Sequence, residues 1–275
     1  MNEDVIVAFI IFPLIILVIY GLYLYRKSKI KKQNFIPIEE IKSILDIDVT
    51  FFHNLNVIDQ DVFAERVQRF IQKVYIHGLR GAKVDNETKV LVGASAIIPI
   101  FHFKEWRYNN IDEVLIYPDA FNKHYDISGQ KRNIIGMVGE GAMNRMMILS
   151  QKALFDGFKN KSAQNTGIHE FVHLIDKSDG SVDGIPEALI HKSLVEPWLQ
   201  AIYETTQNIE NNASIIRKYA ASNKAEFLAV TSEYFFQKPD LLAVEEPELF
   251  HLLNKIYQIP EHNSNNNHIK ESLSN

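Results

Sequence analysis

The segment NTGIHEFVHLID, residues 165–176, carries two histidines four positions apart, with a glutamate directly after the first. On a helix, His169 and His173 would lie on one face and one turn apart, so both neutral imidazoles could bind the same tetrahedral zinc ion. Glu170 would lie at the flank of that face, where it can take a proton from a water molecule activated by the metal. The segment therefore predicts a zinc-dependent hydrolase. The alternative is an ordinary helix with two solvated or hydrogen-bonded histidines.

The opposite face of this expected helix is apolar. Four residues recur along it at helical spacing: Ile168, Phe171, Val172 and Ile175. Burial of that stripe would hold the histidine face in a fixed orientation. Asn165 or Thr166 can cap the first turn. Asp176 follows His169 by seven positions, so we expect it near the ligand face, as an acceptor that orients a histidine.

A catalytic zinc site needs a third protein ligand, and the candidates lie in YAASNKAEFLAVTSEYFF, residues 219–236. Glu226 and Glu233 share one stripe of a second expected helix. Two carboxylates buried there would be costly without a cation. Glu226 also fits a capping box with Asn223, which is its alternative role. Spacing alone does not choose between the two glutamates.

Taken together, these segments resemble the Mlc titration factor A (MtfA) family of zinc peptidases, whose catalytic core is similar to that of anthrax lethal factor. The resemblance rests on the two segments above and on DGSVDGIP, VLIYPDAF, VGEG and ILS, and it spans roughly residues 60–260. It implies that Glu226 is the third ligand of Zn2+, that Glu170 is the general base and that Tyr219 stabilises the oxyanion. This sequence departs from the family pattern at Gln151 and Val172, and neither position is a metal ligand.

These features predict a metallopeptidase that hydrolyses peptide bonds with a zinc-activated water, acting on short-peptide or aminopeptidase-type substrates. Members of the family have been tied to sequestering a transcriptional repressor. The alternative is therefore a zinc-binding regulatory protein that captures a protein partner with little or no catalysis. Glu170 and Tyr219 favour the enzyme, because a pure binding protein needs neither. Glu140, in the segment GMVGEG, either lines the substrate cleft or is a plain loop carboxylate.

Composition narrows the remaining classes of function. The chain has 275 residues, no cysteine and a formal net charge of −5. The lack of cysteine excludes disulfides, thiolate zinc sites and thiol nucleophiles. The acidic balance gives no electrostatic reason to expect direct nucleic-acid binding.

The N-terminal segment is apolar over residues 5–25, where no charged residue occurs. A helix of that length rises about 31 Å, close to the thickness of the hydrocarbon core of a bilayer. The basic run RKSKIKK follows, so the positive-inside rule places the C-terminal side in the cytoplasm. The sequence thus predicts a single-pass protein of the cell membrane. Residues 1–4 would be an extracytoplasmic N-terminus, 5–25 the transmembrane helix and 26–60 a basic juxtamembrane segment and linker. Residues 61–262 would form a cytoplasmic zinc peptidase domain, followed by a disordered tail at 263–275.

The elements that must position the site are short strands followed mostly by helices. Apolar periodicity predicts strands in IDEVLIYPDAF and at the start of RMMILSQKALFDGF. It predicts helices near residues 62–74, 166–177, 190–209 and 224–236. The segment TKVLVGASAIIPIF fits either a strand or a buried helix. This order indicates the α+β class, and the resemblance implies a mostly helical, zincin-like domain with a small β-sheet.

Overall fold

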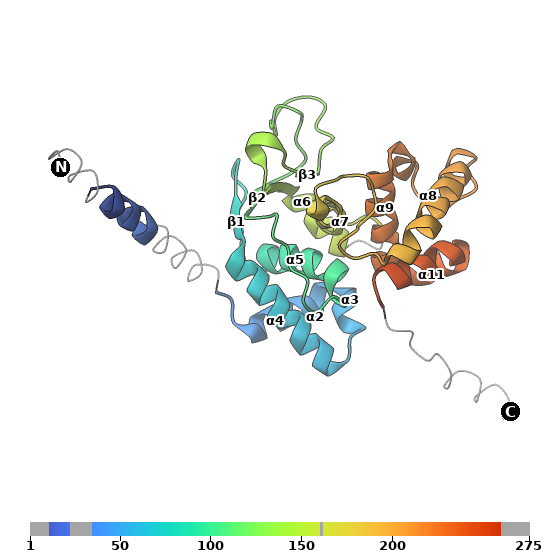
Figure 1. The fold of residues 1–275 in the computed structure, drawn as a ribbon, viewed down its shortest axis with the longest axis horizontal. Helices are drawn as coiled ribbons and strands as arrows, with labels where there is room; N and C mark the ends of the chain where they lie inside the picture. The colour runs from blue at the N-terminus through green and yellow to red at the C-terminus, as the bar shows by residue number, and fades with distance from the viewer. Residues whose placement is uncertain (1–10, 23–34, 160–161, 260–275) are drawn as a thin grey trace, which may run out of the picture.

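The computed structural model describes residues 11–22, 35–159 and 162–259, and Figure 1 shows their arrangement. The described fold is mostly helical. In chain order the longer α-helices after residue 35 are α2 (Ile38–Asp48), α4 (Val57–Lys73), α5 (Asn86–Ile97), α6 (Gln151–Lys159), α7 (Thr166–Asp176), α8 (Val195–Glu210), α9 (Lys224–Gln237) and α11 (Pro247–Ile256). Two shorter α-helices are α3 (Thr50–His53) and α10 (Pro239–Glu245). Short 3-10 helices join them at η1 (Ile98–Ile100), η2 (Gly141–Met143), η3 (Lys177–Asp179), η4 (Lys192–Leu194) and η5 (Lys218–Ser222).

Four strands form one small mixed sheet in the order β1-β2-β4-β3. The strands β1 (Tyr75–Gly78), β2 (Glu113–Tyr117) and β4 (Met146–Ser150) run parallel. The edge strand β3 (Gly136–Val138) pairs antiparallel with β4. Alternate residues of β2 and β4 belong to two different hydrophobic clusters, as expected when a strand directs successive side chains to opposite faces. Both faces of these two central strands are therefore covered.

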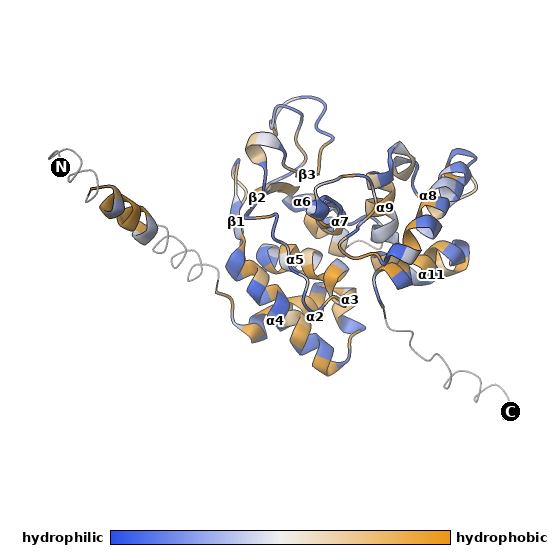
Figure 2. Cartoon of the chain, in the orientation of Figure 1, coloured by the Kyte–Doolittle hydropathy of each residue, from blue (hydrophilic) through white to orange (hydrophobic). Residues whose placement is uncertain are grey.

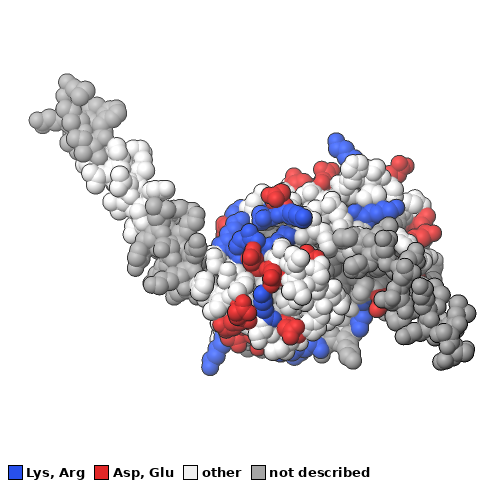
Figure 3. All heavy atoms as spheres, turned by 90° about the horizontal axis from the view of Figure 1, so that it is seen from below, with Lys and Arg blue, Asp and Glu red and all other residues white. Residues whose placement is uncertain are grey.

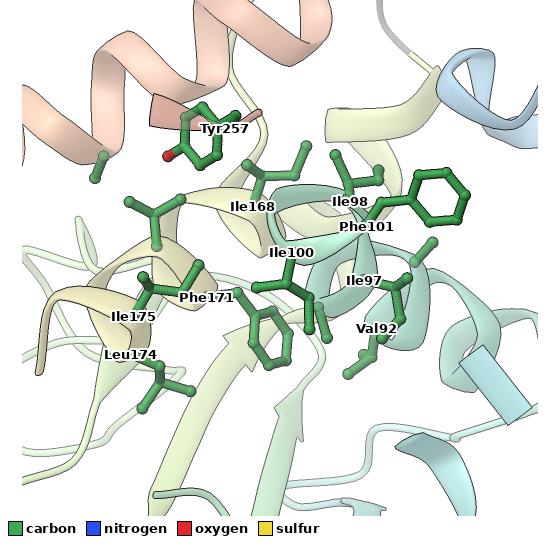
Figure 4. Close-up of a cluster of buried hydrophobic side chains, with 14 of the residues drawn as sticks. Val92, Ile97, Ile98, Ile100, Phe101, Ile168, Phe171, Leu174, Ile175 and Tyr257 are labelled. Carbon is green, nitrogen blue, oxygen red and sulfur yellow. The ribbon is translucent and has the colours of Figure 1, made fainter. Parts of the chain in front are cut away.

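The main hydrophobic core holds α7 in place. The predicted apolar stripe of this helix is buried, and Figure 4 shows Ile168, Phe171 and Ile175 among side chains of α5 and η1. Helix α5 is itself buried along almost its whole length and begins at the N-cap Asp85, whose side chain accepts from the Thr88 N–H. The ambiguous segment TKVLVGASAIIPIF is thus a buried helix, which its apolar run without a period of two also fits.

Most of the predicted elements around the site are present. The strands predicted in IDEVLIYPDAF and at the start of RMMILSQKALFDGF correspond to β2 and β4, and the expected helices correspond to α4, α7, α8 and α9. Two further helices, α2 and α3, lie where the sequence suggested a linker. They bury Ile41, Leu45 and Phe52 in the main core. Helix α2 has 11 residues and α3 only 4, so each offers only a short apolar pattern in the sequence.

The predicted transmembrane helix at residues 5–25 is wrong, and this corrects both the fold class and the predicted single-pass localisation. Within the described ranges, no helix combines the length and the apolar character needed to cross a bilayer. Residues 11–22 are helical and mostly hydrophobic (Figure 2). The rest of the predicted span and the predicted tail at 263–275 lie outside the described residues.

Candidate metal centre

Two capped helices present the predicted metal-binding residues. At the start of α7, the side chain of Asn165 accepts from the Ile168 N–H at 3.1 Å, so Asn165 rather than Thr166 is the cap. At the start of α9, the side chain of Asn223 accepts from the Glu226 N–H at 2.9 Å. Helices α7 and α9 pack against each other. This packing brings together side chains that are more than fifty positions apart in the sequence.

Three donor atoms of these helices converge. The Nε2 atoms of His169 and His173 lie 3.1 Å apart. Oε2 of Glu226 lies 3.1 Å from Nε2 of His169 and 3.5 Å from Nε2 of His173. In a tetrahedral zinc site with bonds of about 2.0–2.1 Å, neighbouring ligand atoms lie about 3.3–3.4 Å apart. The three residues therefore fit the ligand set of a tetrahedral metal site in type, number and spacing.

The protonation of His169 supports this fit. Its Nδ1 lies 2.8 Å from Oε1 of Glu233, and a carboxylate oxygen only accepts. The proton of a neutral His169 ring is therefore on Nδ1, and Nε2 presents a lone pair towards Glu226. Oε2 of Glu226 is buried and, among the described residues, has no hydrogen-bond partner despite its close contacts with the two rings. Lone pairs that face one another in this way suit a bound cation.

The electrostatics of the cluster point the same way. Burial lowers the pKa of His169, but the carboxylates of Glu226 and Glu233 outweigh it and raise that pKa to about 10. Burial raises the pKa of the Glu226 carboxyl, but His169 and His173 hold it well below its usual range. Both shifts mean that the cluster favours a positive charge between these side chains, which either a proton or a metal cation supplies.

Glu233 is the residue that holds the His169 ring. Its side chain is buried, with 1% of its surface exposed. Besides His169, it accepts from the Asn165 N–H at 2.5 Å and from Nη2 of Arg217 at 2.6 Å. Spacing alone left Glu226 and Glu233 as candidates for one role, and the family resemblance implied Glu226. The structure places them at opposite nitrogens of the same imidazole, Glu226 at Nε2 and Glu233 at Nδ1.

Glu170 and Tyr219 line a cleft beside the three donor atoms. Two adjoining hollows of about 380 and 350 Å³ share Gly136, His169, Glu170 and Tyr219 among their lining residues. Glu170 is buried against Gly136, where a Cβ would lie 2.5 Å from its Oε1, so only glycine fits at that position of β3. Tyr219 is half exposed, and its ring stacks beside that of His169 with the centroids 6.2 Å apart.

The edge strand β3 borders this cleft. Gly139 N–H donates to Met146 O, and Ile135 O accepts from Ser150 N–H, each at 2.8 Å. Hydrogen-bonded residues alternate along an antiparallel pair. The peptide groups of Gly136 and Val138 therefore point away from β4, towards the open edge of the sheet. Such an edge can pair with an extended peptide.

Asp176 has a different role from the one that the sequence suggested. Both of its carboxylate oxygens accept from the Gly184 N–H at 3.1 Å, and no described histidine donates to it. Gly184 O in turn accepts from Nε1 of Trp198 at 2.7 Å. A Cβ on Gly184 would lie 2.3 Å from Lys224 O, at the start of α9. Asp176 thus fixes the loop that packs against the helix carrying Glu226.

Two other residues of the site and one strand need the structure to be assigned. The exposed Glu140 lines the same hollow as Glu226, which fits the cleft alternative rather than the plain loop carboxylate. Arg217 carries no signal in the sequence. For β3, the only hint is the glycine-rich run GMVGEG, because closely spaced glycines mark a backbone that is approached closely.

Comparison with known proteins relates most of the chain to one family. The family described as glucose-regulated metallo-peptidase M90 matches residues 23–258. A curated Mlc titration factor A from Escherichia fergusonii is 29% identical, covering 76% of this chain and 82% of the relative. Its counterpart from Salmonella arizonae is also 29% identical, covering 74% of this chain and 85% of the relative. An uncharacterized protein from Synechocystis is 25% identical, covering 78% of this chain and 82% of the relative.

Proposed function

The chain belongs to the glucose-regulated metallo-peptidase M90 family, and on that premise we propose that it is a zinc-dependent peptidase whose metal is held by His169, His173 and Glu226. The observation that carries this proposal is the convergence of their three donor atoms beside the buried Glu170. Two imidazoles and one carboxylate are a typical ligand set of catalytic zinc. When bound there, zinc would polarise a substrate carbonyl and lower the pKa of a water molecule towards neutrality.

Glu170 is the proposed general base. Burial raises the pKa of its carboxyl, although the neighbouring histidines act in the opposite direction. A raised pKa brings a carboxylate closer to the operating pH, where a general base works best. Glu170 takes the proton from the attacking water and can return it to the leaving amine. Glu170 and residues of β3 line the same hollow, so a peptide bound along that strand would lie beside Glu170.

Tyr219 is the proposed oxyanion donor. Burial and the nearby Glu226 carboxylate raise the pKa of its hydroxyl to about 12. The hydroxyl therefore keeps its proton at neutral pH and can donate it in a hydrogen bond. In peptide hydrolysis it would stabilise the negative charge that develops on the former carbonyl oxygen. Tyr219 is half exposed and lines both hollows of the cleft in which a substrate would bind.

The open edge of β3 is the proposed substrate support. Hydrogen bonds from the peptide groups of Gly136 and Val138 would hold an extended substrate chain beside Glu170. Extended binding of this kind favours short or unfolded peptides over folded proteins, because a folded protein rarely offers an unpaired strand. The substrate class of the proposal therefore stays as the sequence predicts it, short-peptide or aminopeptidase-type substrates.

A second candidate function follows from the relatives. They are named Mlc titration factor A, which favours capture of a regulatory protein by those proteins. For this chain the corresponding proposal is a zinc-binding protein that sequesters a regulatory partner with little catalysis. The side chains of Glu170 and Tyr219 in the cleft favour the peptidase.

Metal content and peptide cleavage test the proposal together. We expect the purified wild type to bind one zinc ion per chain and to cleave a chromogenic aminopeptidase-type substrate. A chelator should abolish cleavage, and added zinc should restore it. Glu170→Gln should keep zinc, measured by atomic absorption, but lose at least about 100-fold in turnover. Glu226→Gln should lose zinc. The exposed Glu210→Gln serves as the matched control and should change neither quantity.

Three outcomes would contradict this assignment. Wild-type turnover by the Glu170 variant would remove the general base, and full zinc content in the Glu226 variant would break the ligand set. A zinc-loaded wild type that cleaves no peptide but binds a regulatory protein would select the second candidate function.

A further inference from the structure

A separate cavity of about 270 Å³ lies between α4 and the segment that runs from the end of α5 to Tyr108. It shares no lining residue with the hollows of the candidate metal centre. Its apolar wall is formed by Phe70, Val74, Ile97, Ile100 and Tyr108. Its charged side chains are all basic: Arg66, Arg69, Lys73 and Arg107. The cavity therefore combines an apolar interior with a positive lining.

The positive charge of this lining is only partly balanced by nearby carboxylates. Within the part of the chain that the structure describes, Arg69 alone of the four forms an ion pair, a surface contact with Glu65 at 3.6 Å. Lys73 and Arg107 donate instead to backbone oxygens, those of Tyr108 and Lys104. On the face shown in Figure 3, basic and acidic side chains are intermixed. Four basic side chains around one cavity are thus a local feature of an acidic chain.

Arg66 provides an unused donor at this site. Its side chain is buried, with 5% of the residue exposed. Nη1 donates to Phe101 O at 2.5 Å and Nη2 to Ile100 O at 2.9 Å. Nε is also buried but has no hydrogen-bond partner among the described residues. Buried donors are almost always paired in proteins, so an acceptor from a ligand would satisfy this group.

We propose that this cavity binds a small amphipathic anion, that is, a carboxylate or a phosphate attached to a short apolar body. The apolar wall would bury the body, and the unpaired Nε of Arg66 together with the exposed guanidinium group of Arg107 would bind the headgroup through charge-assisted hydrogen bonds. The volume lies just below the usual range of about 300–1,000 Å³ for ligand pockets, which limits the occupant to a small molecule.

The electrostatics support an anionic occupant. Burial lowers the pKa of Arg66 to about 10, and the positive charges of Arg107 and Arg69 act in the same direction. Arg66 therefore remains charged at neutral pH and is repelled by its neighbours. An anion between these side chains would relieve that repulsion.

The wall of the cavity is continuous with the helix of the metal centre. The rings of Phe70 and Tyr108 contact that of Phe171, with centroid distances of 5.5 and 5.3 Å. Phe171 directly follows Glu170 on α7. A ligand in the cavity would therefore touch the aromatic cluster against which the catalytic helix packs.

Binding of octanoate and octyl phosphate to the full chain tests the proposal. Trp106 stacks edge-on against Tyr108 at 4.8 Å, so its fluorescence should report occupancy, and calorimetry should give the stoichiometry. We expect saturable binding of at least one of the two anions, one per chain. Uncharged 1-octanol should bind at least about tenfold more weakly, because it lacks the charge-assisted hydrogen bonds. The stronger of the two anions identifies the headgroup.

Substitution separates this site from unspecific binding. Arg107→Gln changes an exposed side chain, so the variant should fold, as a thermal melt can verify. It should weaken binding of the anion by about tenfold. The exposed Arg132→Gln, outside the cavity, is the matched control and should bind as the wild type does. The proposal is overturned if neither anion saturates, if 1-octanol binds as tightly as the anions, or if the Arg107 variant retains wild-type affinity.

Discussion

The most informative test of the site is the substitution Glu233→Gln. The carboxylate of Glu233 accepts from Asn165 N–H, His169 Nδ1 and Arg217 Nη2, at 2.5, 2.8 and 2.6 Å. All three groups are donors. The amide of glutamine has one accepting oxygen and one donating nitrogen. At least one of the three donors must then face another donor, although the shape of the side chain is unchanged.

The magnitude follows from burial. A buried donor that loses its acceptor costs about 1–3 kcal/mol. Arg217 also loses a charged partner, but its side chain is 30% exposed, so water replaces part of that interaction. We expect the free energy of unfolding to fall by about 2–4 kcal/mol. For a domain of this size, the melting temperature would fall by on the order of 10 °C.

Metal affinity should change as well. Glu233 fixes the ring of His169 and keeps its proton on Nδ1, and the loss of such a partner typically weakens metal binding by about 10- to 100-fold. We therefore expect the variant to bind zinc, but with a higher dissociation constant. Competition with a chromophoric zinc chelator measures that constant, and calorimetry on the zinc-loaded protein measures the melting temperature. Glu226→Gln should release zinc in the same assay, and the control Glu210→Gln should be unchanged.

Two results would refute this reasoning. Zinc affinity within about twofold of the wild type would show that Glu233 does not support the ligand histidine. Complete loss of zinc from the Glu233 variant, with retention by the Glu226 variant, would exchange the roles of the two glutamates.

Three further substitutions test other parts of the structure. Tyr219→Phe should leave zinc content unchanged by atomic absorption but lower kcat by about 10²- to 10³-fold; an unchanged kcat would exclude the hydroxyl from the reaction. Gly184→Ala would place a Cβ 2.3 Å from Lys224 O at a φ of 76°, so urea titration should show a loss of about 1–3 kcal/mol in stability, and wild-type stability would contradict the tight packing of that loop. In the folded protein, burial raises the pKa of the Asp176 carboxyl to about 6 from 3.8. The protonated carboxyl therefore stabilises the folded state fully below the pKa of the unfolded state, and this contribution is lost as pH rises through 6. The difference in the free energy of unfolding between Asp176→Asn and the wild type should therefore favour the variant by on the order of 2–3 kcal/mol more at about pH 7.5 than at about pH 4. Thermal melts of both proteins at the two pH values measure this, and a difference independent of pH would argue against the raised pKa.

The sequence predicted local features well where spacing alone sets geometry. Two histidines four apart must share a face if their segment is helical, and the apolar stripe of α7 predicted both the helix and the side that is buried. Asn223 could be identified as a cap for the same reason, because its partner is the N–H three positions later. Such features depend on neighbours within one or two turns.

The hydrophobic pattern was less reliable where length mattered. The apolar segment at 5–25 predicted a membrane span, yet no helix among the described residues is long and apolar enough to cross a bilayer. The segment of α5 fitted two structures until its burial between other elements was known. A run of apolar residues indicates that the segment is buried away from water, but it does not indicate which surface covers the segment.

The sequence by itself determined the helices and the faces that they present, including the pair of imidazoles and the glutamate between them. Only the tertiary structure decided which nitrogen of His169 each of Glu226 and Glu233 contacts, and that Asp176 binds a loop instead of a histidine. The physical reason is that helix periodicity is set by hydrogen bonds over four residues, whereas these contacts depend on how α7, α9, β3 and the loop at Gly184 pack. That packing is decided by the shape of the whole core.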